Sequence, residues 1–478
     1  IVNSYDVRGS IEIPRYILYQ SQEYLITSID INSFSSQKSI ISVTFAKDSE
    51  LHSIAKNSFT NSTLEGICIP PNVKVIGERA FSWCNELFSV DFLPNPKLES
   101  IGIDAFSFTS IETITIPPNV VEIGEKAFRN CKNLKSVEFP EKSKLLSISK
   151  DMFSNSFLED ITIPTSVHQI DENAFSNCEY LKSIKIPEDS QLRIIGKSAF
   201  YKTSIESIFI PSQMEELKEG WCNEMNNLTQ ILVSPHNPHF LCIENKYLIG
   251  KSNDQTDNYD ILLFASRDLE FATIPSKIKK ILSFSFSKCL KLKSVTFTEK
   301  SEIFQIGNYS FAYSTLVSIT IPPSVTQICE NAFSRCKKLK FVEFTDNSLL
   351  KTISKFAFFG SSIESIKIPS SVSLIDDCAF SDCYNLKSVK FKEDSNLVSI
   401  SKSVFSNSAV LDASIPPCVN LIDKLAFSGC LDLCSIEFFG DVVSIEKSAF
   451  SRCKKIRLAS FPNAKKIAIA KFAFSGVS

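Results

Sequence analysis

The sequence predicts a repeat solenoid, in which one short structural unit is stacked many times along a single axis. Three observations lead to this expectation: a phenylalanine recurs at intervals of 22 and 25 residues, most intervals carry the pattern L-x-x-I-x-I, and a proline often follows that pattern. Repetition with a period of about 20 to 50 residues is the signature of solenoid architectures. It overrides the length of 478 residues, which alone would suggest several ordinary domains.

The recurring phenylalanine, usually preceded by alanine or serine, defines the repeats. Its spacings alternate between 25 and 22 residues in two series, and the rule slips to 23 and 24 only at the end of the second series. The two series comprise Phe34, Phe59, Phe81, Phe106, Phe128, Phe153, Phe175 and Phe200, then Phe286, Phe311, Phe333, Phe358, Phe380, Phe405, Phe427, Phe450 and Phe474. Cys222 stands where one further phenylalanine would fall, so we expect about 18 rungs in which each phenylalanine points inward and stacks on the next.

The L-x-x-I-x-I segment has the alternation of a short strand with one buried face. Proline has no N–H to donate to a sheet, so the prolines after this segment should end the strand. The segment around Ala-Phe-x-x-Cys is too short for more than one helical turn. Each rung should therefore combine a β-strand with a short helical turn or a convex strand, and a period of 22 to 25 residues with this strand motif falls in the leucine-rich-repeat class.

A longer phrase carries a more specific resemblance. The pattern I-P-x-x-V-x-x-I-x-x-x-A-F-x-x-C-x-x-L-x-x-I occurs at residues 116–137, 163–184 and 368–389. In this pattern nearly the whole chain resembles the BspA-like, or Treponema-type, leucine-rich repeats, and the segments 11–14 and 24–29 are similar to that family's N-terminal cap. The resemblance implies surface proteins of mucosal bacteria and anaerobic protists that adhere to host proteins or other cells. It brings no general catalytic residue.

The regular spacing breaks once, between Cys222 and Phe286, where about 40 residues are extra. Residues 240–249 and 259–264 have strand-like patterns, joined by the polar stretch 251–258, and together they predict a protruding β-hairpin. The expected organisation is an N-terminal cap at 1–28, a first array at 29–234, the hairpin insert at 235–273 and a second array at 274–478. No polar cap follows Phe474, so we expect the second array to be cut short or to continue into further rungs, a linker or an anchor.

Composition and charge exclude several kinds of partner. The 51 basic and 53 acidic side chains give a formal charge of −2, which provides no field for steering nucleic acid or an anionic membrane. The longest apolar stretches, such as 467–474, are far shorter than the roughly 18 residues of a membrane span. The first residues show neither a signal peptide nor a transmembrane pattern. We therefore expect no nucleic-acid partner and no membrane insertion within this chain.

The cysteines predict packing rather than disulfides. Eight of the fifteen share one repeat position, namely Cys84, Cys131, Cys178, Cys289, Cys336, Cys383, Cys430 and Cys453. Most of these are two rungs, or roughly 10 Å, apart, beyond the roughly 7 Å that a disulfide tolerates between Cα atoms. We expect small buried hydrophobic residues, and only Cys430 and Cys453, one rung apart, could meet.

Chemistry-bearing clusters are scarce. His236-x-x-His239-x-x-Cys242 is the only local set of potential metal ligands, but Pro238 within it and the missing fourth ligand favour an ordinary loop. No Ser–His–acid or Cys–His set and no Gly-rich phosphate loop can be assembled. The sequence thus predicts no enzyme activity, no metal and no cofactor.

Candidate binding residues are the outward third and fifth positions of the L-x-x-I-x-I strands, which should line the concave face. The third position is mostly serine or threonine, the composition of a solvated ladder, whereas the fifth varies. The fifth-position candidates for protein binding are Asp91, Glu138, Lys185, Phe209, Leu232, Glu343, Lys367 and Lys390. Phe209 and Leu232 lie on consecutive strands immediately before the insert, where they predict either an interaction patch or a surface against which the insert packs.

These observations predict extracellular protein binding or adhesion through the concave face and the insert. The expected partners are extracellular-matrix or host-cell-surface proteins, and the expected location is the cell surface or the extracellular space. An intracellular, cytoplasmic scaffold or inhibitor that uses the same face is the alternative, which unpaired cysteines would suit. Because leucine-rich repeats carry unrelated specificities on one scaffold, the sequence does not name the ligand.

Overall fold

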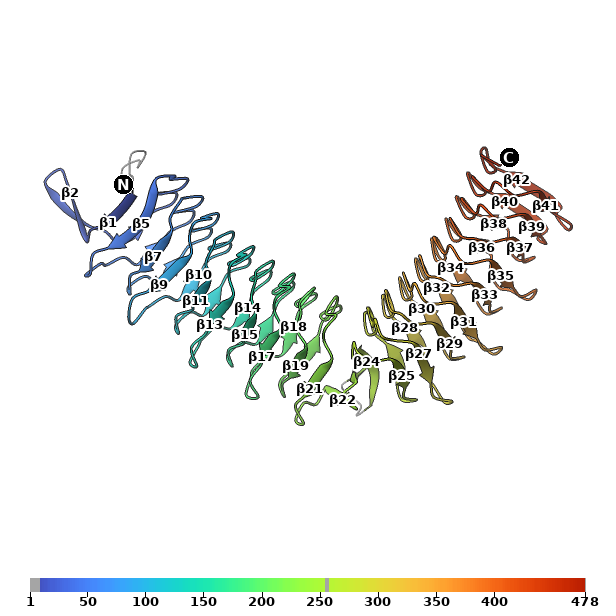
Figure 1. Cartoon of the computed structure of the whole chain (residues 1–478), viewed down its shortest axis with the longest axis horizontal. Coiled ribbons are helices and arrows are strands. Elements are labelled where there is room, and N and C mark those ends of the chain that lie inside the picture. Colours follow the sequence, from blue (N-terminus) through green and yellow to red (C-terminus); the bar gives the residue numbers. More distant parts are fainter. Residues whose placement is uncertain (1–8, 254–257, 478) are drawn as a thin grey trace. The chain divides into compact units, whose positions relative to one another are not determined.

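The computed structural model describes residues 9–253 and 258–477. The chain forms two compact units, Ile1–His239 (unit 1) and Phe240–Ser478 (unit 2), and each unit is a stack of rungs (Figure 1). The first eight residues of the expected cap and residues 254–257 at the expected tip of the insert lie outside the described residues.

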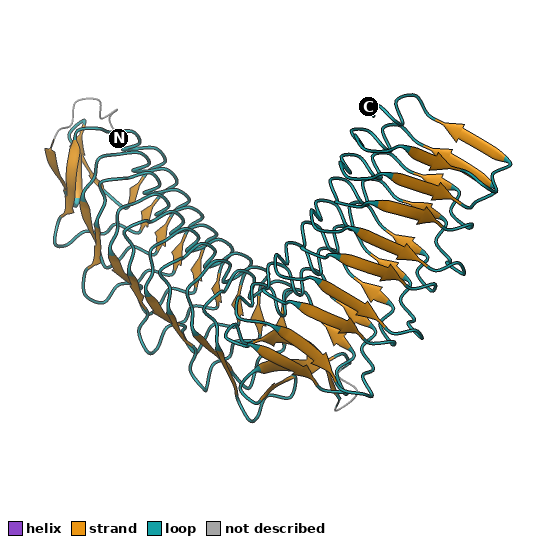
Figure 2. Ribbon diagram, turned by 45° about the vertical axis from the view of Figure 1, so that its right-hand side comes forward, coloured by secondary structure: helices purple, strands orange, loops and turns teal. Residues whose placement is uncertain are grey.

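One long strand per rung builds the first wall of each unit (Figure 2). In unit 1 these strands are β1 (Gly9–Ile13), β5 (Ile40–Phe45), β7 (Gly66–Ile69), β9 (Ser89–Phe92), β11 (Thr113–Thr115), β13 (Ser136–Glu138), β15 (Asp160–Thr162), β17 (Ser183–Lys185), β19 (Ser207–Ile210) and β21 (Gln230–Val233). In unit 2 they are β25 (Phe271–Ile274), β27 (Ser294–Phe297), β29 (Ser318–Ile321), β31 (Phe341–Phe344), β33 (Ser365–Ile368), β35 (Ser388–Phe391), β37 (Asp412–Ile415), β39 (Ser435–Phe438) and β41 (Leu458–Ser460). The described residues thus hold about 19 turns of solenoid, one more than the spine positions indicate.

The long strands pair in parallel and alternate as expected. In β19 and β21, Ile208 lies opposite Ile231, and both are buried, while Phe209 lies opposite Leu232 on the outer surface. We call this outer surface of the long strands the strand face. The prediction of one strand per repeat with a single buried face is confirmed.

A second wall consists of short parallel strands, most of them two residues long. In unit 1 they are β4 (Ser28–Ile29), β6 (Ser53–Ile54), β8 (Val75–Ile76), β10 (Ser100–Ile101), β12 (Glu122–Ile123), β14 (Ser147–Ile148), β16 (Gln169–Ile170), β18 (Ile194–Ile195) and β20 (Glu216–Leu217). In unit 2 they are β26 (Lys280–Ile281), β28 (Gln305–Ile306), β30 (Gln327–Ile328), β32 (Thr352–Ile353), β34 (Leu374–Ile375), β36 (Ser399–Ile400), β38 (Leu421–Ile422), β40 (Val442–Ile445) and β42 (Lys466–Ile469).

The segment around each spine phenylalanine is a turn with left-handed residues two before and two after the ring, not the helical turn that was one of the two expected forms, and the described residues contain no helix. On the Phe128 rung, Lys126 and Asn130 have φ angles of 60° and 59°. The N–H groups of Lys126, Phe128 and Asn130 donate to carbonyls of the next rung over 3.0, 2.9 and 2.9 Å. A helix would pair such groups within its own segment, whereas here they form a third ladder between rungs.

The phenylalanine spine lies between these walls and confirms the sequence prediction. Successive ring centroids are 4.8 to 5.6 Å apart, and neighbouring rings are inclined by at most 26°. Cys222 is buried at the expected defect, together with Trp221 and Met225. In unit 2 the inward residues of both walls and the spine form one continuous core, and the corresponding residues of unit 1 are buried as well.

The insert differs from the predicted protruding hairpin. Strands β22 (Phe240–Ile243), β23 (Tyr247–Lys251) and β24 (Tyr259–Ala265) form an antiparallel meander, and β24 then pairs in parallel with β26. The expected hairpin is present as β23 and β24, but its described strands belong to the solenoid, because Ile249 and Leu262 are fully buried in the core of unit 2. Its burial allows it to continue the short-strand wall.

A buried arginine ends the insert and covers the first turn of unit 2. Arg267 is 4% exposed, and its guanidinium donates to the carbonyls of Ser285 at 2.8 Å and Phe284 at 3.3 Å. The same group lies 4.5 Å above the ring of Phe264. The amide of Ala265 donates to the Ser285 carbonyl as well, so this segment takes the place of a preceding rung's turn.

Replacing Arg267 with methionine is expected to lower the free energy of unfolding by on the order of 3 kcal/mol, because the carbonyls of Ala265, Phe284 and Ser285 lose a charged donor. Urea unfolding and amide exchange in β24 to β28 measure the effect. Arg267→Lys keeps the charge but not the planar fork, so its free energy of unfolding should fall between those of the parent chain and the methionine variant. A methionine variant as stable as the parent chain would show that the guanidinium bonds contribute nothing.

Candidate functional site

The structure places all eight candidate residues on the strand face, in two groups. Asp91, Glu138, Lys185, Phe209 and Leu232 belong to unit 1. Glu343, Lys367 and Lys390 belong to unit 2. Phe209 is half-buried and the other seven are exposed.

Phe209 and Leu232 are brought together as directly opposed residues of β19 and β21. Leu232 is 46% exposed, so the pair presents an apolar surface to solvent. Lys185 occupies the corresponding position of β17, the next strand on the N-terminal side. The three residues form a line across three strands, with a cation at one end and two apolar side chains at the other. This line, Lys185–Phe209–Leu232, is the candidate binding site of unit 1.

The acidic candidates lie apart from that line and are held by hydroxyl groups. Ser89 Oγ donates to Asp91 over 2.7 Å, and Thr115 Oγ1 donates to Glu138 over 3.2 Å. The serine and threonine positions are thus more than solvated spacers, because some of them orient the carboxylates of the strand face.

In unit 2, Lys367 and Lys390 are directly opposed on β33 and β35. Like charges at such a position repel each other, so this pair is a place where an anionic group would relieve repulsion. Glu343 lies one strand away on β31, where Thr320 Oγ1 donates to its carboxylate over 3.4 Å.

Sequence reasoning missed two features of the strand face. The position before the serine column alternates in sign over Glu112, Lys135, Glu159, Lys182 and Glu206, and in unit 2 the same column holds ion pairs such as Lys293–Glu270 at 2.6 Å and Lys340–Glu364 at 3.1 Å. Exposed pairs of this kind contribute little to stability, because water and salt screen them. The other missed feature is a break in the serine column, where two exposed aromatic residues stand instead. They are Phe271 and Phe341, at 64% and 47% exposure.

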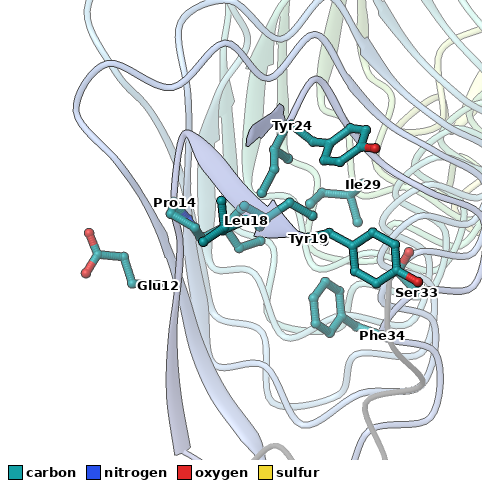
Figure 3. Close-up of a pocket in the computed structure, with 11 residues that line it drawn as sticks. Glu12, Pro14, Leu18, Tyr19, Tyr24, Ile29, Ser33 and Phe34 are labelled. Carbon is teal, nitrogen blue, oxygen red and sulfur yellow. The ribbon is translucent and has the colours of Figure 1, made fainter. Parts of the chain in front are cut away.

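A hollow at the N-terminal end of unit 1 was also missed. The cap hairpin of β2 (Tyr16–Tyr19) and β3 (Gln22–Leu25) leans over the first rung and leaves a cavity of about 710 Å³. Tyr19 and Tyr24 of the cap and Ile29 and Phe34 of the first rung contribute to its lining (Figure 3). Its chemistry is that of an apolar hollow rimmed by phenol groups. No sequence signal gives the angle at which a cap hairpin meets its solenoid.

The segment with the metal-ligand spacing is a turn held by Asn237. That side chain is buried and donates to the carbonyls of Pro211 and Met214 at 2.7 and 3.0 Å, while its oxygen accepts the amide of His239 at 2.8 Å. Among the described residues, no group of three or more His, Cys, Asp or Glu side chains is arranged to hold a metal ion.

The repeated cysteines form a hydrogen-bonded ladder with hydroxyl residues. Cys131 donates to the carbonyl of Phe106 over 3.1 Å and lies 3.3 Å from Thr109 Oγ1. Burial raises the pKa of Cys131 to about 11. All fifteen cysteines lie in the described part of the chain as free thiols, and Cys430 and Cys453 each bond a phenylalanine carbonyl instead of one another. Protonated, buried thiols pack and donate; they do not act as nucleophiles.

No curated protein matches the chain. Among solved structures, the chain is similar to a leucine-rich repeat protein from Bacteroides ovatus, with 22% identity, 90% of this chain and 86% of the other covered, and a TM-score of 0.48. It is also similar to a leucine-rich cell surface protein from Faecalibacterium prausnitzii (20% identity, 96% and 89% covered, TM-score 0.40) and to the pneumococcal vaccine antigen PcpA (18% identity, 98% and 91% covered, TM-score 0.39).

Across residues 9–253 and 258–477, the structure offers no helix with the length and apolarity of a membrane span.

The repeats themselves identify the family. The model of the BspA-type leucine-rich repeat region matches residues 18–135, 99–229, 262–386, 304–434 and 351–478, which together include most of the chain. The chain therefore belongs to the BspA-type leucine-rich repeat family.

Proposed function

We propose that this chain is a non-catalytic solenoid that binds proteins through its strand face and serves in adhesion at the cell surface. The carrying observation is the Lys185–Phe209–Leu232 line, in which half-buried Phe209 and exposed Leu232 stand side by side on a part of the unit 1 strand face composed mainly of hydroxyl and charged side chains. Apolar anchors surrounded by a polar rim are typical of binding hot spots. The partners are extracellular-matrix or host-cell-surface proteins.

Membership of the BspA-type family supports a binding role, and the arrangement of the titratable groups on the strand face supports a non-catalytic one. The titratable side chains of the strand face are exposed and spread along the rungs, whereas catalytic groups converge in a pocket. The extended surface instead suits a large partner, since solenoids bind over many repeats.

Replacing Phe209 and Leu232 with alanine is expected to weaken binding to the surface of cultured epithelial cells by about 10- to 30-fold, because the pair supplies the apolar anchor. Flow cytometry with the fluorescently labelled chain measures the effect, and the far-ultraviolet spectrum should not change. Phe157→Ala with Tyr180→Ala is the matched control, since those rings also form an exposed pair in unit 1, 4.8 Å apart, but lie outside the long strands. Equal binding by both double variants would contradict the assignment, and loss of folding in the first would show that its pair is structural.

The second candidate function is an intracellular scaffold or inhibitor that uses the same face. The observation in its favour is that every cysteine is a free thiol, as in a reducing compartment. Surface labelling of intact source cells separates the two: labelled protein on the cell surface supports adhesion, whereas an unlabelled cytosolic pool would overturn it.

A further inference from the structure

Aromatic and basic side chains follow the turns of four consecutive rungs in unit 2. The backbone of each rung is left-handed two residues after the spine phenylalanine. At this position stand Lys288, Tyr313 and Arg335, with φ angles of 55°, 59° and 56°. On the fourth rung the position belongs to Gly360, and Phe359 beside it supplies the ring. We call Lys288, Tyr313, Arg335 and Phe359 the turn-edge row.

Cations and rings alternate along this row. The Nζ atom of Lys288 lies 5.6 Å from the ring centroid of Tyr313, and the Cζ atom of Arg335 lies 5.9 Å from the same ring. The guanidinium of Arg335 is also 5.5 Å from the ring centroid of Phe359. Each contact has the geometry of a cation–π interaction. Tyr313 is 43% exposed and Arg335 is exposed, so the row presents its edges to solvent.

Further aromatic and basic residues widen the row. Phe284 and Tyr309, each four residues before a member of the row on the same rung, stack at 5.1 Å. Phe356 meets Phe359 edge to face at 5.5 Å. Lys355 covers the ring of Phe356 at 5.1 Å. The row is therefore rich in cations and aromatic rings, in a chain whose overall charge is close to zero, and it ends before Asp382, which fills the same turn position on the next rung.

The turns do not need these rings. Left-handed backbone is costly for bulky L-residues and inexpensive for asparagine and glycine. The same turn position is filled by Asn130, Asn155 and Asn177 in unit 1 and by Asn407 and Gly429 in unit 2. Aromatic residues also stand at this position in unit 1, where Trp83 and Phe108 stack on each other at 3.9 Å. Tyr313 differs from them in having a cation beside its ring on each neighbouring rung.

We propose that the turn-edge row binds an acidic segment of a partner protein. Tyr313 has cations beside its ring on both neighbouring rungs, and Phe359 has Arg335, so these rings are poorly placed to stack on bases. Arg335 is exposed, and the N–H fork of a guanidinium matches a carboxylate in a bidentate way. Among the described residues, no carboxylate forms an ion pair with Arg335. The row and the strand face of unit 1 share no residue, so this inference is independent of the proposed function.

The test uses the full chain and a fluorescein-labelled oligoglutamate peptide, with fluorescence anisotropy at physiological ionic strength. Arg335→Gln should weaken binding by about tenfold or more, because a charged anchor is lost. Tyr313→Asn should weaken binding several-fold while leaving the thermal midpoint unchanged or higher, since asparagine suits this turn. Arg452→Gln is the matched control: Arg452 occupies the same turn position with φ of 63°, but between Gly429 and Gly476, and its loss should leave the affinity unchanged.

Three results would overturn the proposal. One is equal affinity in the Arg335 and Arg452 variants. Another is a lower thermal midpoint with unchanged affinity in Tyr313→Asn, which would make the row a stabilising stack. The last is tighter, Arg335-dependent binding of oligothymidylate or of a heparin oligosaccharide than of oligoglutamate, which would assign the row to a different class of partner. Phe209→Ala with Leu232→Ala should bind the peptide like the parent chain, so failure of either proposal is distinguishable from failure of the other.

Discussion

Replacing Phe128 with alanine is expected to lower the free energy of unfolding by about 3 to 5 kcal/mol. Phe128 is fully buried, and its ring lies 5.4 Å from that of Phe106 and 5.6 Å from that of Phe153. The loss is at the upper end for a core residue because the rungs cannot close the cavity. Their spacing is fixed by backbone ladders, such as the bond from Phe128 N–H to the Met152 carbonyl on the next rung.

Urea unfolding followed by circular dichroism measures this loss, with Phe157→Ala as the control. Phe157 is in the same unit but is 40% exposed, so its removal should cost less than about 1 kcal/mol. Since each rung contacts only its neighbours, amide exchange should rise most between the Phe106 and Phe153 rungs. Similar urea midpoints for the two variants would mean that the spine is not the main source of stability.

The spine, the long strands and the buried cysteines could be predicted because each is marked in every repeat. A wrong assignment at one rung is corrected by the others. Residues that depart from the repeat, such as Trp221 and Cys222, still take the expected place, since the neighbouring rungs fix the space they fill. The same regularity predicted that all eight candidate residues lie on the strand face.

The left-handed turns could not be predicted, because their hydrogen bonds join different rungs. Nothing within Lys126–Asn130 distinguishes bonds to the next rung from bonds within a helical turn, and Lys126 is not a residue that favours positive φ. The burial of the insert could not be predicted for a related reason. Its strands have hairpin patterns, but their burial depends on the pairing of β24 with β26, which local sequence does not contain.

The stability of the solenoid is expected to fall steeply as the pH rises above about 8.5, because the buried thiols resist ionisation. Burial raises the pKa of Cys131 and Cys383 to about 11 and that of Cys178 and Cys336 to about 12. Burial also raises the pKa of Cys430 to about 11, and it is the main cause that raises the pKa of Cys453 to about 12. An unfolded thiol has a pKa near 8.5.

The sign follows from the proton counts. Below the unfolded pKa both states keep their thiol protons, so the full stability is present. Between about pH 8.5 and pH 11 the unfolded chain releases these protons while the folded chain retains them, and the free energy of unfolding therefore decreases with pH. Each thiol removes about 1.4 kcal/mol per pH unit. Six thiols acting together remove on the order of 8 kcal/mol per unit, which is comparable to the whole stability of a typical domain.

Urea midpoints at about pH 7.5 and pH 10 test this expectation, and serine variants isolate the thiols from the lysines and tyrosines that titrate nearby in pH. Serine already fills the same position on alternate rungs, as Ser156 and Ser361 do beside Cys178 and Cys383. A chain with the six cysteines changed to serine should therefore fold and should lose much less stability at the higher pH. Cys434→Ser, at an exposed thiol, should leave the pH dependence unchanged. If the serine chain weakens as steeply as the parent, the buried ladder is not what makes this solenoid sensitive to base.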